Sequence, residues 1–285
     1  MEAKIVSRAM TVAMALAGDL HLRVDDVVVI QNSNMLSLHL LPCGVFARVA
    51  LVGQEVAAFE VELAGRLAAT RSPVATLEPR VEPRVHERDG FAVTLWTHYD
   101  TVAPDPDFPS AYADALRRLH SGMRSVEIAA PHFLDRVAEA ERLVTNRDAT
   151  PALTGTDRHL LLGTLHSARE QISGRSPAEQ LLHGEPHPGN LLNTRDGPLF
   201  IDFETCCRGP VEFDLAHVPE EVAAHYPGID HVLLAQCRRL VLALVAAWRW
   251  DIHDDFPDGH RHGRNILTLL RKGPPWPPLG GLTTE

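Results

Sequence analysis

The segment 183–190, His-Gly-Glu-Pro-His-Pro-Gly-Asn, is a polar loop between apolar runs, and it constrains the fold more than any other stretch. Its two prolines exclude a helix, and its two glycines permit backbone conformations that other residues avoid. The loop holds a carboxylate, Glu185, and an amide, Asn190, and a second carboxylate, Asp202, follows a hydrophobic run further along. Hard oxygen ligands of this kind suit Mg²⁺. Phosphoryl transfer uses that metal and a carboxylate that orients the attacking hydroxyl.

Composition narrows the class of partner. The chain has 285 residues, 45% of them hydrophobic, which is enough for one large domain or two modest ones. Its formal net charge is −10. An acidic protein lacks the basic footprint that nucleic acid requires. The charge suits a cationic substrate, although many enzymes are acidic for solubility alone.

Features that would place the chain in a membrane or outside the cell are missing from the sequence pattern. Charged residues interrupt the first apolar stretch, and no cleavage site follows it. No run approaches the roughly 20 apolar residues of a membrane span, and the longest candidate is 240–248. The four cysteines form no CxxC pair. We expect a reduced, cytoplasmic monomer or homodimer without a membrane or nucleic-acid partner.

The periodicity of apolar residues changes near residue 98. Before it, the pattern predicts strands at 27–30, 36–40, 45–51 and 91–96, and helices at 3–17 and 54–69. After it, the pattern predicts helices at 112–120, 133–144, 158–172, 229–249 and 260–271, around a loop-and-strand segment at 181–216. We therefore expect an α+β protein with an N-terminal domain at 1–98 and a C-terminal domain at 99–285.

At the polar loop the chain resembles the aminoglycoside phosphotransferase and choline kinase superfamily, whose motif is H-G-D-x-x-x-x-N followed by I-D-F. In this resemblance Glu185 matches the catalytic acid, and Asn190 and Asp202 match the two metal ligands. The segment 209–216 is similar to the family's G-x-x-x-x-D-L-A, in which the acid, here Asp214, braces the loop. The resemblance implies a kinase-like fold of two lobes, a small antiparallel sheet at the N-terminus and a larger helical C-terminal lobe.

The same resemblance implies how phosphates are bound. Ser33 and Asn34, in the turn between the first two strands, would contact phosphate oxygens. Arg48 takes the position of the family's phosphate-binding lysine. Glu60, on the following helix, would pair with that cation, and Glu62 is its nearest rival for the role.

The nucleotide base is expected at the junction of the lobes. Thr97, His98 and Tyr99 follow the last predicted strand of the N-terminal half and match the interlobe hinge. Their backbone groups would bind the edge of the base. The implied cofactors are ATP or GTP, together with Mg²⁺.

Two departures from the family pattern leave a second interpretation open. Glu185 replaces an aspartate and reaches one methylene further, and a positioning error near 1 Å can cost about a hundredfold in rate. Arg48 replaces a lysine, and the two side chains are not interchangeable. The alternative is a catalytically impaired nucleotide-binding scaffold.

A polar cluster between the last two predicted helices has three interpretations. It consists of His253, Asp254, Asp255, Asp258, His260 and His262. It could be a solvated loop, an acidic rim that binds the acceptor, or a zinc or iron site. The function that the sequence predicts is transfer of a phosphoryl group from ATP to a hydroxyl of a small molecule. The acceptor could be an aminoglycoside-like or other cationic antibiotic, which would make the protein a resistance enzyme.

Overall fold

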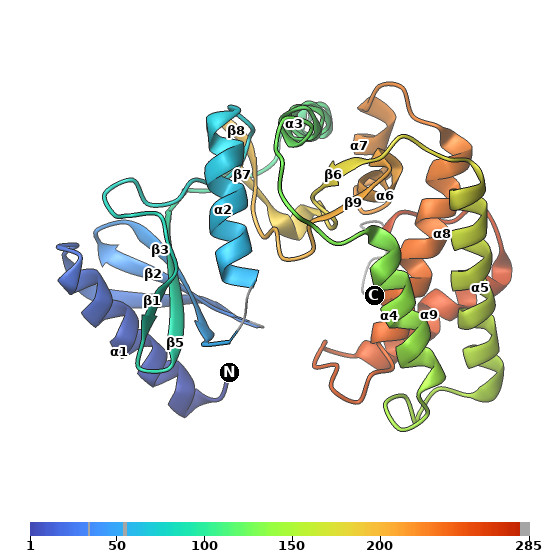
Figure 1. The fold of residues 1–285 in the computed structure, drawn as a ribbon, viewed down its shortest axis with the longest axis horizontal. Coiled ribbons are helices and arrows are strands. Elements are labelled where there is room, and N and C mark those ends of the chain that lie inside the picture. The colour runs from blue at the N-terminus through green and yellow to red at the C-terminus, as the bar shows by residue number, and fades with distance from the viewer. Residues whose placement is uncertain (34, 54–55, 280–285) are drawn as a thin grey trace. The chain divides into compact units, whose positions relative to one another are not determined.

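The computed structural model describes residues 1–285 except 34, 54–55 and 280–285. The chain forms two compact units, shown in Figure 1. The first contains Met1–Asp105 together with Leu192–Glu204, and the second contains Pro106–Leu191 together with Thr205–Glu285. The predicted domain boundary after residue 98 stays a prediction.

The first unit is built on an antiparallel sheet with the order β1-β2-β3-β5-β4. Its strands are β1 (Val24–Asn32), β2 (Leu36–Pro42), β3 (Val45–Leu51), β4 (His86–Arg88) and β5 (Phe91–Thr97). The alternation of buried and less buried positions along β2 and β3 follows the period of two that a half-buried strand requires. Strands predicted from the sequence are therefore confirmed, with ends shifted by a few residues.

Helices α1 (Ala3–Asp19) and α2 (Val56–Ala69) accompany this sheet (Figure 1). The apolar stripe of α1, including Ala9, Val12 and Leu16, forms one core with Leu38 and Val49 of the sheet. Because side chains alternate across a strand, the neighbours of these core residues point to the opposite face of the sheet. Arg48, which is expected to meet the nucleotide phosphates, lies next to Val49 on β3 and so points to that opposite face.

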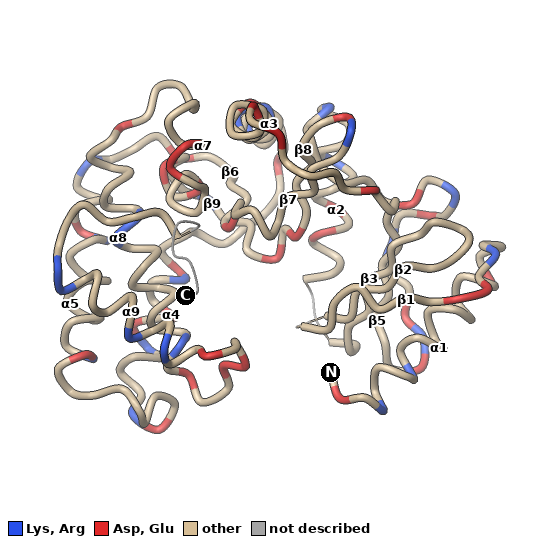
Figure 2. Tube along the Cα trace, turned by 180° about the vertical axis from the view of Figure 1, so that it is seen from behind, with Lys and Arg blue, Asp and Glu red and all other residues tan. Residues whose placement is uncertain are grey.

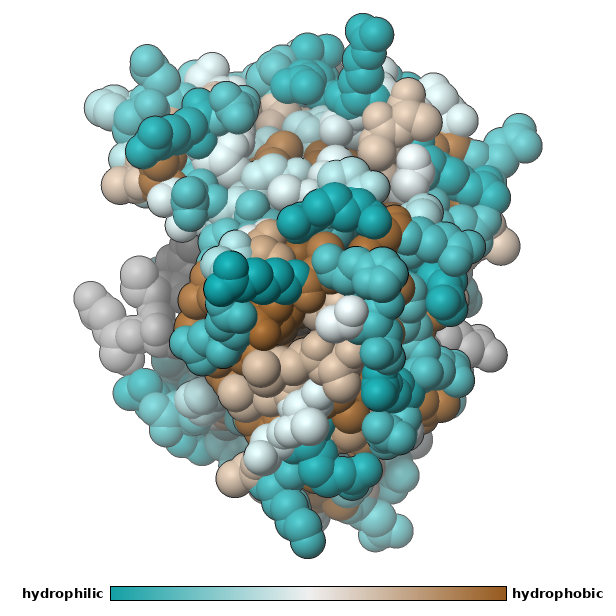
Figure 3. All heavy atoms as spheres, turned by 90° about the vertical axis from the view of Figure 1, so that its left-hand side faces the viewer, coloured by the Kyte–Doolittle hydropathy of each residue, from teal (hydrophilic) through white to brown (hydrophobic). Residues whose placement is uncertain are grey.

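The edge strand β1 leaves apolar side chains in contact with solvent. Val28, Val29 and Ile30 are 42%, 40% and 54% exposed. Figure 3, which looks at the side of the molecule that carries α1, shows hydrophobic atoms between hydrophilic ones on this surface. Apart from Leu191, the hairpin of β7 (Leu191–Thr194) and β8 (Gly197–Phe200) also belongs to the first unit, and its Phe200 bridges to Val74.

The second unit is mainly helical. It contains α3 (Phe108–Met123), α4 (Phe133–Thr145), α5 (Gly155–Gly174), α6 (Val211–Leu215), α7 (Glu220–His225), α8 (His231–Trp248) and α9 (Gly259–Lys272). A two-stranded sheet pairs β6 (Gln180–Leu182) with β9 (Cys207–Gly209). The two short helices α6 and α7 were not predicted, because segments of five and six residues are too short to display helical periodicity. The predicted α+β class is confirmed, with an antiparallel sheet in the first unit and mainly helices in the second.

Helix α8 spans 18 residues, lies within the predicted helix at 229–249, and is strongly apolar. By length and composition it could cross a membrane, since an 18-residue window has a mean hydropathy of 1.4. In the structure α8 contacts α4, α5, α6 and α9, and its buried residues form the centre of the second unit. A core helix that is mostly covered by its neighbours has the same composition, and 56% of this window is buried in the structure.

Candidate functional site

In the first unit, one arginine gathers three carboxylates. Arg48 on β3 donates from Nη1 to Glu60 of α2 at 2.6 Å, and from Nη2 to Glu204 at 2.9 Å and Asp202 at 3.4 Å. The predicted pairing of Arg48 with Glu60 is therefore present, whereas Glu62 pairs with Arg66 instead. Four residues from three segments of the chain form one ionic cluster.

Burial and charge oppose one another in this cluster. Burial lowers the pKa of Arg48, but the charges of Glu60, Asp202 and Glu204 outweigh it, so the pKa is raised and the guanidinium stays charged. Burial also raises the pKa of Glu60, while Arg48 opposes the rise and Asp202 adds to it. Glu60 accepts a second hydrogen bond from the backbone N–H of Phe203 at 3.0 Å. That bond ties α2 directly to the segment that carries Asp202.

Asp202 occupies a demanding backbone position. Its φ is 65°, in the left-handed region that most side chains avoid and that aspartate tolerates better than most. The carboxylates of Asp202 and Glu204 both contact the same nitrogen of Arg48. Two hard oxygen donors that close together are suited to a divalent cation such as Mg²⁺. Sequence reasoning missed Glu204, although the pattern I-D-F-E placed a second carboxylate two residues after Asp202.

The predicted hinge residues lie at the end of β5 and just beyond it, and part of their backbone is already occupied. The N–H of Thr97 donates to Thr76 at 2.9 Å, and the N–H of His98 donates to Gly44 at 3.3 Å. The rings of His98 and His39 stack with centroids 3.6 Å apart and planes 1° apart. Of the three hinge residues, only Tyr99 has a backbone N–H with no hydrogen-bond partner within the described residues.

The predicted phosphate turn is described only in part. Ser33 lies on the exposed turn after β1, where its hydroxyl accepts from Gln31 at 3.2 Å. Its backbone N–H bonds to Met35 at 3.2 Å. Asn34 lies outside the described residues, so its predicted role stays a prediction.

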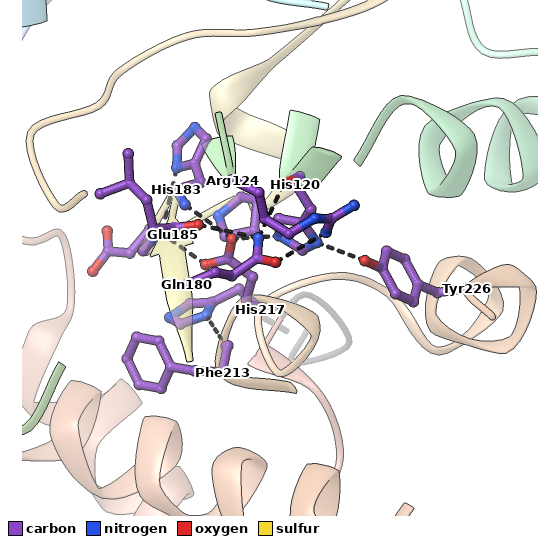
Figure 4. A network of polar contacts seen from close by, with 12 residues as sticks. His120, Arg124, Gln180, His183, Glu185, Phe213, His217 and Tyr226 are labelled. Atoms are coloured by element: carbon purple, nitrogen blue, oxygen red, sulfur yellow. Dashed lines mark hydrogen bonds and ion pairs between the residues drawn. The ribbon is translucent and has the colours of Figure 1, made fainter. Parts of the chain in front are cut away.

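In the second unit, a buried aspartate binds the backbone at the start of the polar loop 183–190. Asp214 of α6 accepts the backbone N–H of His183 at 2.9 Å and that of Gly184 at 2.8 Å. It also bonds Nε2 of His120 at 2.9 Å, and the other ring nitrogen of His120 lies 2.8 Å from the hydroxyl of Tyr226 (Figure 4). Burial raises the pKa of Asp214, but the lowering contributions, of which the hydrogen bond from His120 is the largest, together outweigh it, so the pKa is lowered and the residue is a carboxylate.

Gly184 is required where it stands. Its φ is 92°, and a Cβ at this position would meet the carbonyl oxygen of Thr205 at 1.9 Å. No side chain can occupy that space without moving backbone. The glycine therefore lets the loop pass close to the chain that leads into β9.

Glu185, the predicted catalytic acid, is anchored at both ends. Its backbone carbonyl accepts from Asn190 Nδ2 at 3.0 Å, and its carboxylate pairs with Arg136 of α4. Burial by itself raises the pKa of Glu185, but the lowering contributions, of which the charge of Arg136 is the largest, together outweigh it, so the pKa is lowered. Glu185 is therefore ionised and can accept a proton or a hydrogen bond from a hydroxyl. No pattern in the sequence distinguished Arg136 from the other arginines.

His217, which follows α6, is buried and neutral. Burial lowers the pKa of His217 to about 4, and its Nδ1 donates to the carbonyl of Phe213 at 2.9 Å. In the unfolded chain the ordinary value is 6.5. Between pH 6.5 and 4 the unfolded state therefore binds a proton that the folded state does not, so stability falls as pH falls.

This pH dependence can be measured. We expect the free energy of unfolding to decrease by about 3 kcal/mol through this one group between pH 6.5 and 4. Replacing His217 by asparagine should flatten the curve in that window, as read by urea unfolding at several pH values. The matched control is His159→Asn, an exposed histidine of α5. Equal slopes for wild type and His217→Asn would contradict the assignment.

The polar cluster at 253–262 does not form a metal site. No group of three or more His, Cys, Asp or Glu side chains that could hold a metal occurs among the residues that the structure describes, and this covers the cluster. Asp254 pairs with Arg249 at 2.7 Å, and Asp258 pairs with Arg261 at 3.1 Å. Figure 2 shows the acidic residues of the loop between α8 and α9. The zinc or iron interpretation is therefore wrong.

Comparisons with known proteins show the family of the chain. The model of the family described as "Phosphotransferase enzyme family" matches residues 45–264. None of the curated proteins compared matches the chain.

Solved structures match over nearly the whole chain. An amicoumacin kinase, hAmiN, in complex with AMP-PNP, Ca²⁺ and Ami is 12% identical, with a TM-score of 0.70 over 97% of this chain and 98% of that one. Aminoglycoside 2'-phosphotransferase-IIIa with GDP is 14% identical, with a TM-score of 0.68 over 95% and 99%. A choline/ethanolamine kinase family protein from Mesorhizobium loti is 16% identical, with a TM-score of 0.65 over 94% and 93%. The chain therefore belongs to the phosphotransferase enzyme family and is a small-molecule phosphotransferase.

Proposed function

We propose that the protein transfers the γ-phosphoryl group of ATP to a hydroxyl of a small, amine-bearing molecule. The observation that carries the proposal is the contact of Arg48 with Glu60, Asp202 and Glu204. Arg48 and Asp202 lie 154 positions apart in the chain, so the fold itself brings these groups together. A cation for phosphate and a pair of acids for a metal are the parts that phosphoryl transfer needs. Arg48 would turn from these acids to the nucleotide phosphates.

The proposed metal ligands are oxygen donors. Asp202 and Glu204 would hold Mg²⁺, and the amide oxygen of Asn190 would be the further ligand that the family motif implies. Asn190 fits this role, because its Nδ2 is used by the carbonyl of Glu185 and its oxygen is left over among the described contacts. When bound, the metal supplies neutralisation of phosphate charge.

The base of the nucleotide would bind beside the residues after β5. Because the N–H groups of Thr97 and His98 are already bonded within the first unit, the base would be recognised by the remaining backbone groups and by Tyr99. Ser33 and Asn34 would contact the phosphates. ATP or GTP would be the nucleotide, and the two are compared directly in the experiment below.

On the acceptor side, Glu185 would accept the hydrogen bond of the attacking hydroxyl and orient it toward the phosphorus. The acidic net charge of −10 supports an acceptor that carries amines. The names of the structural neighbours include an aminoglycoside phosphotransferase, an amicoumacin kinase and choline or ethanolamine kinases. Cationic hydroxylated antibiotics and amino alcohols are therefore the proposed substrate class.

A phosphorylation screen tests the proposal. The protein would be incubated with Mg²⁺ and either ATP or GTP against a panel of aminoglycosides, amicoumacin, choline, ethanolamine and uncharged sugars. We expect one phosphate to be added to an amine-bearing member, detected by mass, and no addition when Mg²⁺ is chelated. Phosphorylation of the uncharged sugars alone would contradict the amine requirement.

The second candidate is a nucleotide-binding scaffold that catalyses no phosphoryl transfer. It is favoured by the engagement of Glu185 with Arg136, which gives the acid a partner in the absence of substrate. Thermal unfolding with ATP and Mg²⁺, measured alongside slow ATP hydrolysis, separates the candidates. A stabilisation by ATP without hydrolysis, and without any product in the screen, would establish the scaffold.

A further inference from the structure

We propose that Arg136 is the positioning residue for Glu185: it holds one carboxylate oxygen so that the other is left for the acceptor hydroxyl. The inference rests on the proposed function, since it assigns Glu185 to the acceptor. The contact is between Nη2 of Arg136 and Oε1 of Glu185. Within the described part of the chain, Oε2 of Glu185 has no hydrogen-bond partner.

The need for such a residue follows from the glutamate itself. The backbone around Glu185 is fixed, because Asp214 binds the N–H of Gly184 at 2.8 Å and Tyr112 donates to the carbonyl of Pro186. The side chain of Glu185 has one more rotatable bond than an aspartate, so a fixed backbone alone does not fix its carboxylate. A rate that depends on the placement of that carboxylate requires a second anchor.

Arg136 has the properties of a rigid anchor. It lies in α4, whose N-terminus is fixed by a capping box between His132 and Asp135. Its guanidinium lies over the ring of Trp248 in α8, 5.5 Å from the centroid, and its side chain is 19% exposed. A planar guanidinium stacked on an aromatic ring presents its donors in a fixed direction, which a lysine ammonium cannot do.

The arrangement is not one that stability alone would favour. Nη1 of Arg136 is buried and has no hydrogen-bond partner among the described residues. An unmade bond of a buried cation lowers stability, and such groups in native proteins call for another explanation. Holding Glu185 in one orientation is an explanation that the remaining contacts support.

Acceptor-independent ATP hydrolysis with Mg²⁺, in which water replaces the hydroxyl, tests the positioning role. We expect Arg136→Met to lower kcat by about tenfold to a hundredfold while KM for ATP changes by less than about twofold. Arg136→Lys should recover part of the rate. In a Glu185→Gln background, Arg136→Met should have no further effect, because the two residues act as one unit. Equal losses in both backgrounds would overturn the proposal.

A second readout does not require turnover. In nuclear magnetic resonance spectra of the ¹⁵N-labelled protein, the guanidinium Nη–H signals of Arg136 should be visible through slowed rotation, and Glu185→Gln should abolish them. Unchanged signals in Glu185→Gln would show that the pair does not form and would overturn the proposal. If Glu185→Gln hydrolyses ATP at the wild-type rate while its Arg136 signals are lost, the proposed function fails and the pair stands. The matched control for Arg136→Met is Arg142→Met, which replaces an exposed arginine of α4.

Discussion

Replacing Asp202 by alanine should lower the rate of phosphoryl transfer by at least about a hundredfold while leaving both units folded. The carboxylate is 36% exposed and lies in a charged cluster, so its removal exposes no core residue. Arg48 keeps its hydrogen bonds to Glu60 and Glu204, so its guanidinium is not left without carboxylate partners. The measurement is product mass with the acceptor from the screen, together with ATP hydrolysis and thermal unfolding.

The matched control for this prediction is Asp196→Ala. Asp196 is an exposed acid in the turn between β7 and β8, on the same segment of the first unit. It should retain wild-type turnover. If Asp202→Ala also kept wild-type turnover, the assignment of Asp202 to the metal would be wrong, and with it the proposed mechanism.

Replacing Asp214 by asparagine should have the largest effect on stability, about 3–5 kcal/mol. Asp214 is fully buried and accepts two backbone N–H bonds and one from His120. An amide keeps the shape but loses the charge, and its NH₂ group would face donors instead of accepting from them. Urea unfolding measures the loss, and a thermal midpoint lower by roughly 10 °C should accompany it.

Glu221→Gln serves as the control for charge removal, because Glu221 is an exposed residue of α7. Its stability should stay within about 0.5 kcal/mol of wild type. Asp214→Asn should also turn over more slowly at temperatures where it is folded, since the loop that carries Glu185 loses its support. A variant with wild-type stability would show that Asp214 does not brace this loop.

Much of the fold followed from local patterns. Alternation along residues 36–40 and 45–51, and helical periodicity along the longer helices, located these elements within a few residues. Helices α6 and α7 were not predicted from the sequence, because a helix of one or two turns shows no helical periodicity. The sequence also did not predict the burial of α8 among other helices, because an apolar run does not show which elements cover it.

The sequence by itself determined the chemical groups of the site. The order of Glu185, Asn190, Asp202 and Asp214, with their intervening glycines and prolines, was sufficient to name the family to which the chain belongs. Such spacing is informative because a short loop fixes its members relative to one another through the backbone.

Only the tertiary structure decided which partners those groups meet. Arg136 joins Glu185 from 49 positions away, Glu204 joins Arg48 from 156 positions away, and His120 joins Asp214 from 94. It also showed that the acids at 254 and 258 pair with arginines instead of gathering around a metal. Ion pairs across such separations depend on how helices and strands pack. One chain with 27 basic and 37 acidic residues offers far too many pairings for sequence alone to select among them.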